Sequence, residues 1–334
     1  MAKKTVGREA TGRTPQRKGG RRRAALCAAL LLAFTGPPVA AQGNFGSPAV
    51  ARGAIQDVTA ELNRALQSGN AQALSKAIAD AQSVIASLDT LGQLGQYQKE
   101  LAPLLAAYFG ALGQVLSLGV KSCEGGSLSD GFATAHLMTS LSETTKKKIN
   151  NLSTYESKLA SCLGLTLKID SMVKNAGLRY VAHVDITVKL NYSLKDNTYS
   201  GTGNIQKVIQ KFEDPYGGCS VKLTFTPAQF TVKRMALSLD PNFRPKDAIL
   251  QDYTAGETNE AATISCPKVG TQTIPFMNWG VVYSGIHEAH QNYSVEQWQT
   301  GSAPLLLRKH LDQSFGEGEA MLSESTDYVL TKTR

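Results

Sequence analysis

The chain has few charged residues and lacks the motifs by which most enzymes are recognised from sequence. Charged residues make up 19% and hydrophobic residues 42% of its 334 residues. This balance excludes collagen, coiled coils, disordered acidic tails and polytopic membrane proteins. No glycine-rich phosphate loop ends in Lys-Ser or Lys-Thr, and no serine nucleophile elbow occurs. Gly201-Thr202-Gly203 lacks the third glycine of a dinucleotide fingerprint, so we interpret these glycines as part of a turn or bulge.

The first 41 residues have the pattern of an export signal. Lys3–Arg23 is polar and basic, Ala24–Phe34 is apolar, and Val39-Ala40-Ala41 supplies small residues for cleavage. The apolar run is shorter than the roughly 20 residues that span a bilayer. We therefore predict cleavage after Ala41 and an exported protein of the periplasm, cell envelope or extracellular space. General secretion and the twin-arginine route are both open.

The basic character of the chain belongs to this leader. The formal net charge is +8. Residues 1–41 hold nine Lys or Arg and one acidic residue, whereas the other 293 residues hold 26 of each sign. A chain without net charge has no electrostatic footprint for nucleic acid, so we predict no nucleic-acid partner.

Four cysteines remain once Cys27 leaves with the leader, and they contain no C-x-x-C motif. Their wide spacing does not suit a zinc site, and an even number in an exported chain predicts two disulfides. Three connectivities are open. Pairing in order gives Cys123–Cys162 and Cys219–Cys266. Each bridge would close a loop of about 40–50 residues and contribute about 4 kcal/mol in the chain-entropy model.

Residues 53–177 have the apolar spacing of helices, and we predict an N-terminal antiparallel helical bundle there. Apolar residues recur every three or four positions from Ile55 onward, and Gly69-Asn70 has the chemistry of a helix stop. The last of five helices is expected to run from Leu152 to Lys174. Residues 42–52, before the bundle, are predicted to be a flexible tail.

One expected helix contains an uncharged stretch, Leu101–Val120, that is 20 residues long. This length would just cross a bilayer, although Pro103 and Gln114 interrupt its apolar character. The central helix of a five-helix bundle is also apolar on most faces, and we favour this interpretation. The alternative is a protein that associates with membranes through residues 101–120.

Residues 178–334 change to the alternating pattern of strands, which predicts an antiparallel β-sandwich or barrel domain. Tyr180–Leu194 and Thr198–Ile209 form an expected hairpin around a polar turn. Gly and Pro recur at regular distances after it. Phe243–Tyr253 is expected to be irregular, and Leu305–Asp312 to be a short helix. The complete prediction is an α+β protein.

The segment His287-Glu288-Ala289-His290 is similar to a zinc-hydrolase motif, but its histidines are three residues apart instead of four. The preceding residues read as a strand, on which positions 287 and 290 point to opposite faces. We interpret the segment as a polar hairpin loop. The alternative is a metal-dependent hydrolase in which His287 and His290 hold zinc and Glu288 is the base. No other cofactor is predicted.

Four aromatic residues surround the same segment: Trp279, Tyr283, Tyr293 and Trp298. They are candidates to line a ligand pocket or interface, although core packing is the more common use of such residues. We predict no catalytic residue, because no acid, base and nucleophile set is apparent. The predicted function is a non-enzymatic binding or structural module whose partner is an envelope component or a small ligand.

Overall fold

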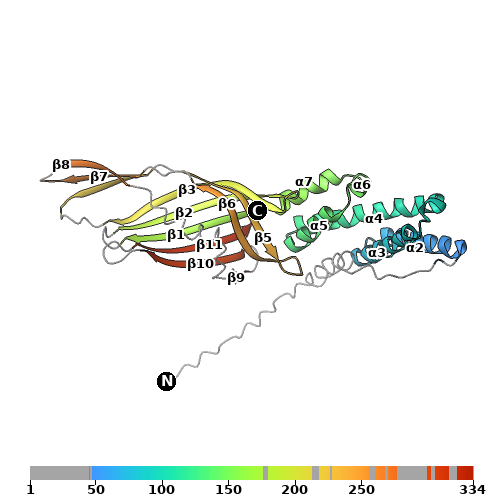
Figure 1. The fold of residues 1–334 in the computed structure, drawn as a ribbon. Coiled ribbons are helices and arrows are strands. Elements are labelled where there is room, and N and C mark those ends of the chain that lie inside the picture. Colours follow the sequence, from blue (N-terminus) through green and yellow to red (C-terminus); the bar gives the residue numbers. More distant parts are fainter. Residues whose placement is uncertain are drawn as a thin grey trace, which may run out of the picture.

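The computed structural model describes Phe45 and residues 47–175, 180–212, 218–225, 228–255, 260–267, 270–276, 299–301, 305–315 and 322–333. The predicted export signal lies outside these residues. Within them, helices come first and strands second, so the α+β class is confirmed. The helices gather at one end of a curled antiparallel sheet, and a small three-stranded sheet projects at the other end (Figure 1).

The helical part contains α2 (Pro48–Ser68), α3 (Ala71–Thr90), the 3₁₀ turn η1 (Leu94–Tyr97), α4 (Gln98–Glu124), α5 (Leu128–Ser140), α6 (Glu143–Lys146) and α7 (Leu152–Cys162). Local chemistry explains the break between α2 and α3. Gly69 adopts a left-handed φ of 62°, which glycine reaches without steric cost. The Asn70 side chain then accepts hydrogen bonds from the N–H groups of Gln72 and Ala73, at 2.9 and 3.2 Å.

The long helix α4 is the centre of the helical part. It packs against α2, α3, α5 and α7. Among the described residues, Leu94–Glu124 is the helical stretch long and apolar enough to cross a membrane, and 44% of its most apolar window is buried inside the protein. Leu104, Leu112 and Leu116 are fully buried in this core. Packing against the other helices therefore gives this apolar segment protein partners along its length.

A glycine allows α4 and α5 to approach closely. A Cβ atom at Gly119 would collide with the hydroxyl of Thr134 on α5. The Thr134 side chain is fully buried and donates to the Asp130 carbonyl oxygen at 2.6 Å, so it has little freedom to move away. The absence of a side chain at residue 119 thus sets the distance between the two helices.

Eight strands form one antiparallel sheet in the order β6-β5-β3-β2-β1-β11-β10-β9, and β4, β7 and β8 form the smaller sheet. The strands of the large sheet are β1 (Leu165–Asn175), β2 (Tyr180–Ser193), β3 (Thr198–Phe212), β5 (Ala228–Leu239), β6 (Pro245–Ala255), β9 (Gln299–Thr300), β10 (Leu305–Phe315) and β11 (Leu322–Lys332). Those of the small sheet are β4 (Ser220–Phe225), β7 (Glu260–Cys266) and β8 (Gly270–Phe276). The large sheet curls so far that β6, the strand at one edge, approaches β9 and β10 at the other edge.

The two faces of the large sheet differ as period-two alternation requires. On β1, Leu165, Leu167 and Ile169 are buried inside the curl, whereas Lys168 and Asp170 lie on the outer face. The inner face of the strands forms one apolar core together with residues from the ends of α4, α5 and α7. The helical part therefore closes one end of the curled sheet.

Two tyrosine side chains of the large sheet hold the helical part in this position. Phe132 of α5 packs edge-on against Tyr192 of β2, with 6.0 Å between ring centroids. The Tyr199 hydroxyl of β3 donates to the carbonyl oxygen of Leu163, just after α7, at 3.1 Å. Burial raises the pKa of Tyr199 well above its usual value, so this hydroxyl stays protonated and able to donate.

Two glycines on β3 allow the sheet to curl. A Cβ atom at Gly201 or Gly203 would collide with the backbone carbonyl oxygens of Lys189 or Thr187 on β2. The pairing of β3 with β5 is also irregular between Tyr199 and Gly201. Interpreting these glycines as bulge residues therefore agrees with the structure, and the backbone of β3 lies unusually close to that of β2 at this point.

The structure contains two disulfides, Cys123–Cys162 and Cys219–Cys266, which are the pairs obtained by pairing in order. The first joins the end of α4 to the end of α7, immediately before β1 begins. Nearby, the Lys332 ammonium of β11 donates to the Cys123 carbonyl oxygen at 2.9 Å, so the last strand also bonds to the end of α4. The second bridge joins the residue before β4 to the end of β7.

Four local predictions are wrong. Residues 48–52, expected to belong to a flexible tail, form the start of α2, because the Ser47 side chain caps this helix and Pro48 suits its first position. The helix expected to continue to Lys174 ends at Cys162, and residues 165–175 form β1, so the sheet begins before the predicted boundary at residue 177. Leu305–Asp312 lies in a strand instead of a helix, and most of Phe243–Tyr253 lies in β6. β1 pairs with β11, far away in the chain, and this long-range pairing outweighs the local pattern. β6 and β10 form hairpins with the neighbouring strands β5 and β11, and this pairing stabilises their extended conformation.

We predict that Gly119→Ala destabilises the protein by about 1–3 kcal/mol, the usual cost of overpacking a core. The added methyl group would push the buried Thr134 hydroxyl away. Gly113→Ala on the same helix is the matched control, since a Cβ atom there meets only Ile149 at 3.9 Å. This control should be neutral or gain up to about 1 kcal/mol from helix propensity. Urea unfolding monitored by circular dichroism measures both, and equal stabilities would contradict the packing argument.

Candidate functional site

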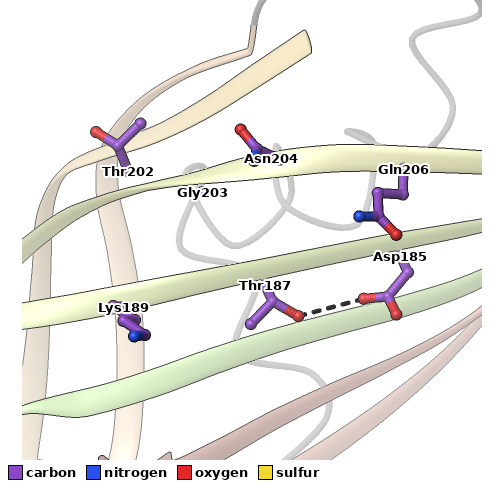
Figure 2. A pocket seen from close by; sticks show the side chains of 7 residues that line it. All are labelled: Asp185, Thr187, Lys189, Thr202, Gly203, Asn204 and Gln206. Carbon is purple, nitrogen blue, oxygen red and sulfur yellow. Dashed lines mark hydrogen bonds between the residues drawn. The ribbon is translucent and has the colours of Figure 1, made fainter. Parts of the chain in front are cut away.

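The outer face of the large sheet carries a groove between β2 and β3, which we call the outer groove. It encloses about 300 Å³, the lower end of the range for ligand pockets. Figure 2 shows its polar side chains, which come from both strands. The lining residues are Asp185, Thr187 and Lys189 of β2 and Thr202, Gly203, Asn204 and Gln206 of β3.

The strand register explains how these side chains meet. Asp185 pairs with Gln206 and Thr187 with Asn204, so their side chains stand opposite each other on the same face. Gly203 contributes only backbone to the groove. In the close view, Asp185 accepts a long hydrogen bond of 3.4 Å from the Thr187 hydroxyl (Figure 2). The groove therefore presents carboxylate, ammonium, hydroxyl and amide groups along a short stretch of two neighbouring strands.

One end of the groove continues into a line of carboxylates across the sheet. Asp185 of β2, Asp170 of β1 and Asp327 of β11 occupy the same register level on three adjacent strands, and His310 of β10 follows at that level. We call the three aspartates the acidic row. Like charges directly opposite each other on neighbouring strands destabilise a sheet, so the row needs cationic neighbours.

Lys168 and His183 both contact Asp170, the second member of the row. The Lys168 ammonium lies 3.1 Å from Asp170 and 3.7 Å from Asp185. His183 Nε2 lies 2.6 Å from the other carboxylate oxygen of Asp170. Burial raises the pKa of Asp170, but the hydrogen bonds from His183 and Lys168 outweigh burial and hold that pKa below its usual value.

Asp327 has a corresponding pair of partners on β10. It accepts a hydrogen bond from the Arg308 guanidinium at 3.0 Å, and its carboxylate lies 2.9 Å from His310 Nδ1. His310 Nε2 lies 3.2 Å from Asp312, so both ring nitrogens face carboxylates. The hydrogen bond to Asp327 raises the pKa of His310. Burial raises the pKa of Asp327, but His310 and Arg308 outweigh it, and the net direction is downward.

A second polar cluster lies inside the curl. Ser171, Thr326 and Glu324 are each at most 3% exposed. The Ser171 hydroxyl donates to Glu324 at 3.0 Å, and the Thr326 hydroxyl lies 2.7 Å from the same carboxylate oxygen and 2.8 Å from Ser171. Because these hydrogen bonds connect β1 with β11, they help to fix the register on which the acidic row depends.

The sequence predicted a metal or ligand site around residues 279–298. His287, Glu288, His290, Trp279, Tyr283, Tyr293 and Trp298 all lie outside the described residues. Within the described part of the chain, no group of three or more His, Cys, Asp or Glu is arranged to hold a metal ion.

Sequence reasoning missed the outer groove, although part of the signal was present. His183, Asp185, Thr187 and Lys189 alternate with apolar residues and so share one face of the predicted strand. Asp170 was assigned to a helix. Its position beside Asp185 and Asp327 depends on the pairing of the first strand with the last.

The chain matches no protein-family model, no curated protein and no solved structure.

The pKa directions define a pH range for the ion pairs. The pKa values of Asp170 and Asp327 are lower in the folded protein than the unfolded-chain pKa of about 3.9. Their ion pairs therefore stabilise the fold fully above about pH 3.9, and this stability is lost as the pH falls through the lower folded pKa values. The pKa of His310 is higher in the folded protein than the unfolded-chain pKa of about 6.5. Its ion pairs therefore stabilise the fold fully below about pH 6.5, and this stability is lost as the pH rises through the higher folded pKa. These ion pairs are strongest between about pH 4 and 6.5.

We predict that His310→Gln lowers the free energy of unfolding by about 0.5 kcal/mol at pH 5.5 and by much less at pH 9, a modest effect because the side chain is half exposed. His136→Gln is the matched control. This exposed histidine contacts the Phe243 ring, and no carboxylate of the described residues forms an ion pair with it. Urea titrations at the two pH values make the comparison. An equal loss at both pH values would argue against the ion pair as the cause.

Proposed function

We propose that the protein is an exported, non-enzymatic binding module and that the outer groove holds a small polar ligand. The observation that carries this proposal is the groove itself, in which two adjacent strands present converging polar side chains around 300 Å³ of space. The leader pattern and the two disulfides support an oxidising compartment such as the periplasm or cell envelope.

The chemistry of the groove favours binding over reaction. Its hydroxyl and amide groups, from Thr187, Thr202, Asn204 and Gln206, are good hydrogen-bonding partners and poor nucleophiles at neutral pH. All four groups are oriented by strands of a continuous sheet, which is a rigid support for recognition. The helical part, which we propose to be an antiparallel bundle, closes one end of the curled sheet that forms this support.

The affinity should be modest, because the groove is shallow and its side chains are mostly exposed. A small ligand gains on the order of 0.3 kcal/mol per non-hydrogen atom. A molecule of about 16 such atoms should therefore bind with a dissociation constant on the order of 0.1–1 mM. Weak binding of this kind suits a molecule that is abundant in the compartment.

We predict that at least one of two polar probes, trialanine or maltotriose, binds the purified disulfide-bonded protein and that Asn204→Arg abolishes this binding. The arginine would fill the groove from an exposed position, where it should not affect folding. Ser314→Arg, on the same sheet face but outside the groove, is the control and should bind as the parent protein does. Isothermal titration calorimetry measures the affinities. Absence of binding by both probes, or binding that survives Asn204→Arg, would refute the proposed function.

A further inference from the structure

We propose that the ligand of the outer groove is a short zwitterionic peptide in an extended conformation, with its terminal ammonium at Asp185 and its terminal carboxylate at Lys189. This inference rests on the proposed function and adds the chemical class of the ligand. It comes from the distribution of charge along the groove, where Asp185 and Lys189 stand at the two ends and neutral polar groups stand between them.

The length of the groove limits the ligand to two or three residues. Asp185 and Lys189 are four residues apart on one face of β2, which corresponds to about 13 Å along the strand. An extended peptide advances about 3.3–3.6 Å per residue. A charged hydrogen bond at each end adds about 2.8 Å. Two residues therefore match the distance of about 13 Å, and three residues, which reach about 16 Å, fit when the flexible Lys189 side chain leans outward along the strand.

The middle of the groove is suited to peptide groups. Asn204 and Gln206 each carry an amide with both a donor and an acceptor, and Thr187 and Thr202 add hydroxyls that can do either. A peptide also presents N–H and C=O groups in alternation, so it can satisfy these side chains along its length. Because none of the described residues that line the groove is aromatic or large and apolar, the peptide's own side chains should be small or polar.

The charge around each end is unequal and matches a zwitterion. At the Asp185 end, the four aspartates of β1, β2, β10 and β11 outnumber the one lysine and the one arginine that pair with them. Lys168 lies closer to Asp170 than to Asp185, which leaves Asp185 able to accept from a ligand ammonium. At the other end, no carboxylate of the described residues forms an ion pair with Lys189.

Other small ligands use this arrangement less well. A neutral oligosaccharide would bring no opposite charge to Asp185 or to Lys189. A ligand with charge of one sign only would be attracted at one end and repelled at the other. Charge complementarity at both ends, at a fixed separation, therefore selects a zwitterion over both classes.

The test is a set of four peptides titrated calorimetrically into the purified protein at pH 7.5: trialanine, N-acetyl-trialanine, trialanine amide and N-acetyl-trialanine amide. We expect trialanine to bind most tightly, and removal of either terminal charge to weaken binding about three- to tenfold. In Asp185→Asn, trialanine and N-acetyl-trialanine should bind equally. In Lys189→Gln, trialanine and trialanine amide should bind equally.

The variants separate a role in recognition from a role in folding, because each should remove the preference for one terminus and keep the preference for the other. If the doubly capped peptide binds as tightly as trialanine, or if maltotriose binds and trialanine does not, the peptide inference is overturned. The proposed function would then still stand, provided Asn204→Arg abolishes the binding that is seen. If no probe binds the parent protein, both the inference and the proposed function fail.

Discussion

The close approach of β3 to β2 at two glycines is the constraint on which the rest of the structure depends. No residue with a Cβ atom fits at Gly201 or Gly203 unless the two strands move apart, because the carbonyl oxygens of Lys189 and Thr187 occupy that space. The approach has consequences on both faces. On the inner face it brings Tyr199 into the core, where it reaches Leu163 beyond α7. On the outer face it places the polar side chains of β2 and β3 around the groove.

Two bonds between the helical part and the large sheet help to keep the sheet curled. The Cys123–Cys162 bridge connects the ends of α4 and α7 just before β1, and Lys332 of the last strand bonds to the same end of α4. β1 and β11, which are the first and last strands of the large sheet in chain order, are therefore both held at the junction. Since these strands are neighbours in the sheet, the junction fixes the two strands that carry Asp170 and Asp327.

Local parts of the fold could be predicted from the sequence, and parts that depend on distant pairing could not. The stop at Gly69-Asn70 and the hairpin of β2 and β3 follow from capping chemistry and alternation, which act over a few residues. Residues 165–174 have the local pattern of a helix, whereas their strand conformation depends on pairing with β2 on one side and with β11, about 150 residues later, on the other. The outer groove shows the same division. Asp185 and Lys189 were visible on one face of a strand, whereas the position of Asp170 between Asp185 and Asp327 required the register.

The acidic row is neutralised unevenly. Lys168 and His183 contact Asp170, and Arg308 and His310 contact Asp327, and these contacts hold the pKa values of both carboxyls below their usual range. At Asp185 the ion pair is longer, because Lys168 lies 3.7 Å from this carboxylate and 3.1 Å from Asp170. A ligand ammonium placed at Asp185 would supply positive charge on the side of the row that faces the groove. Binding would then add an ion pair at the member of the row whose ion pair within the fold is longest, so the same row that is held together by its own cations would also favour a cationic ligand group.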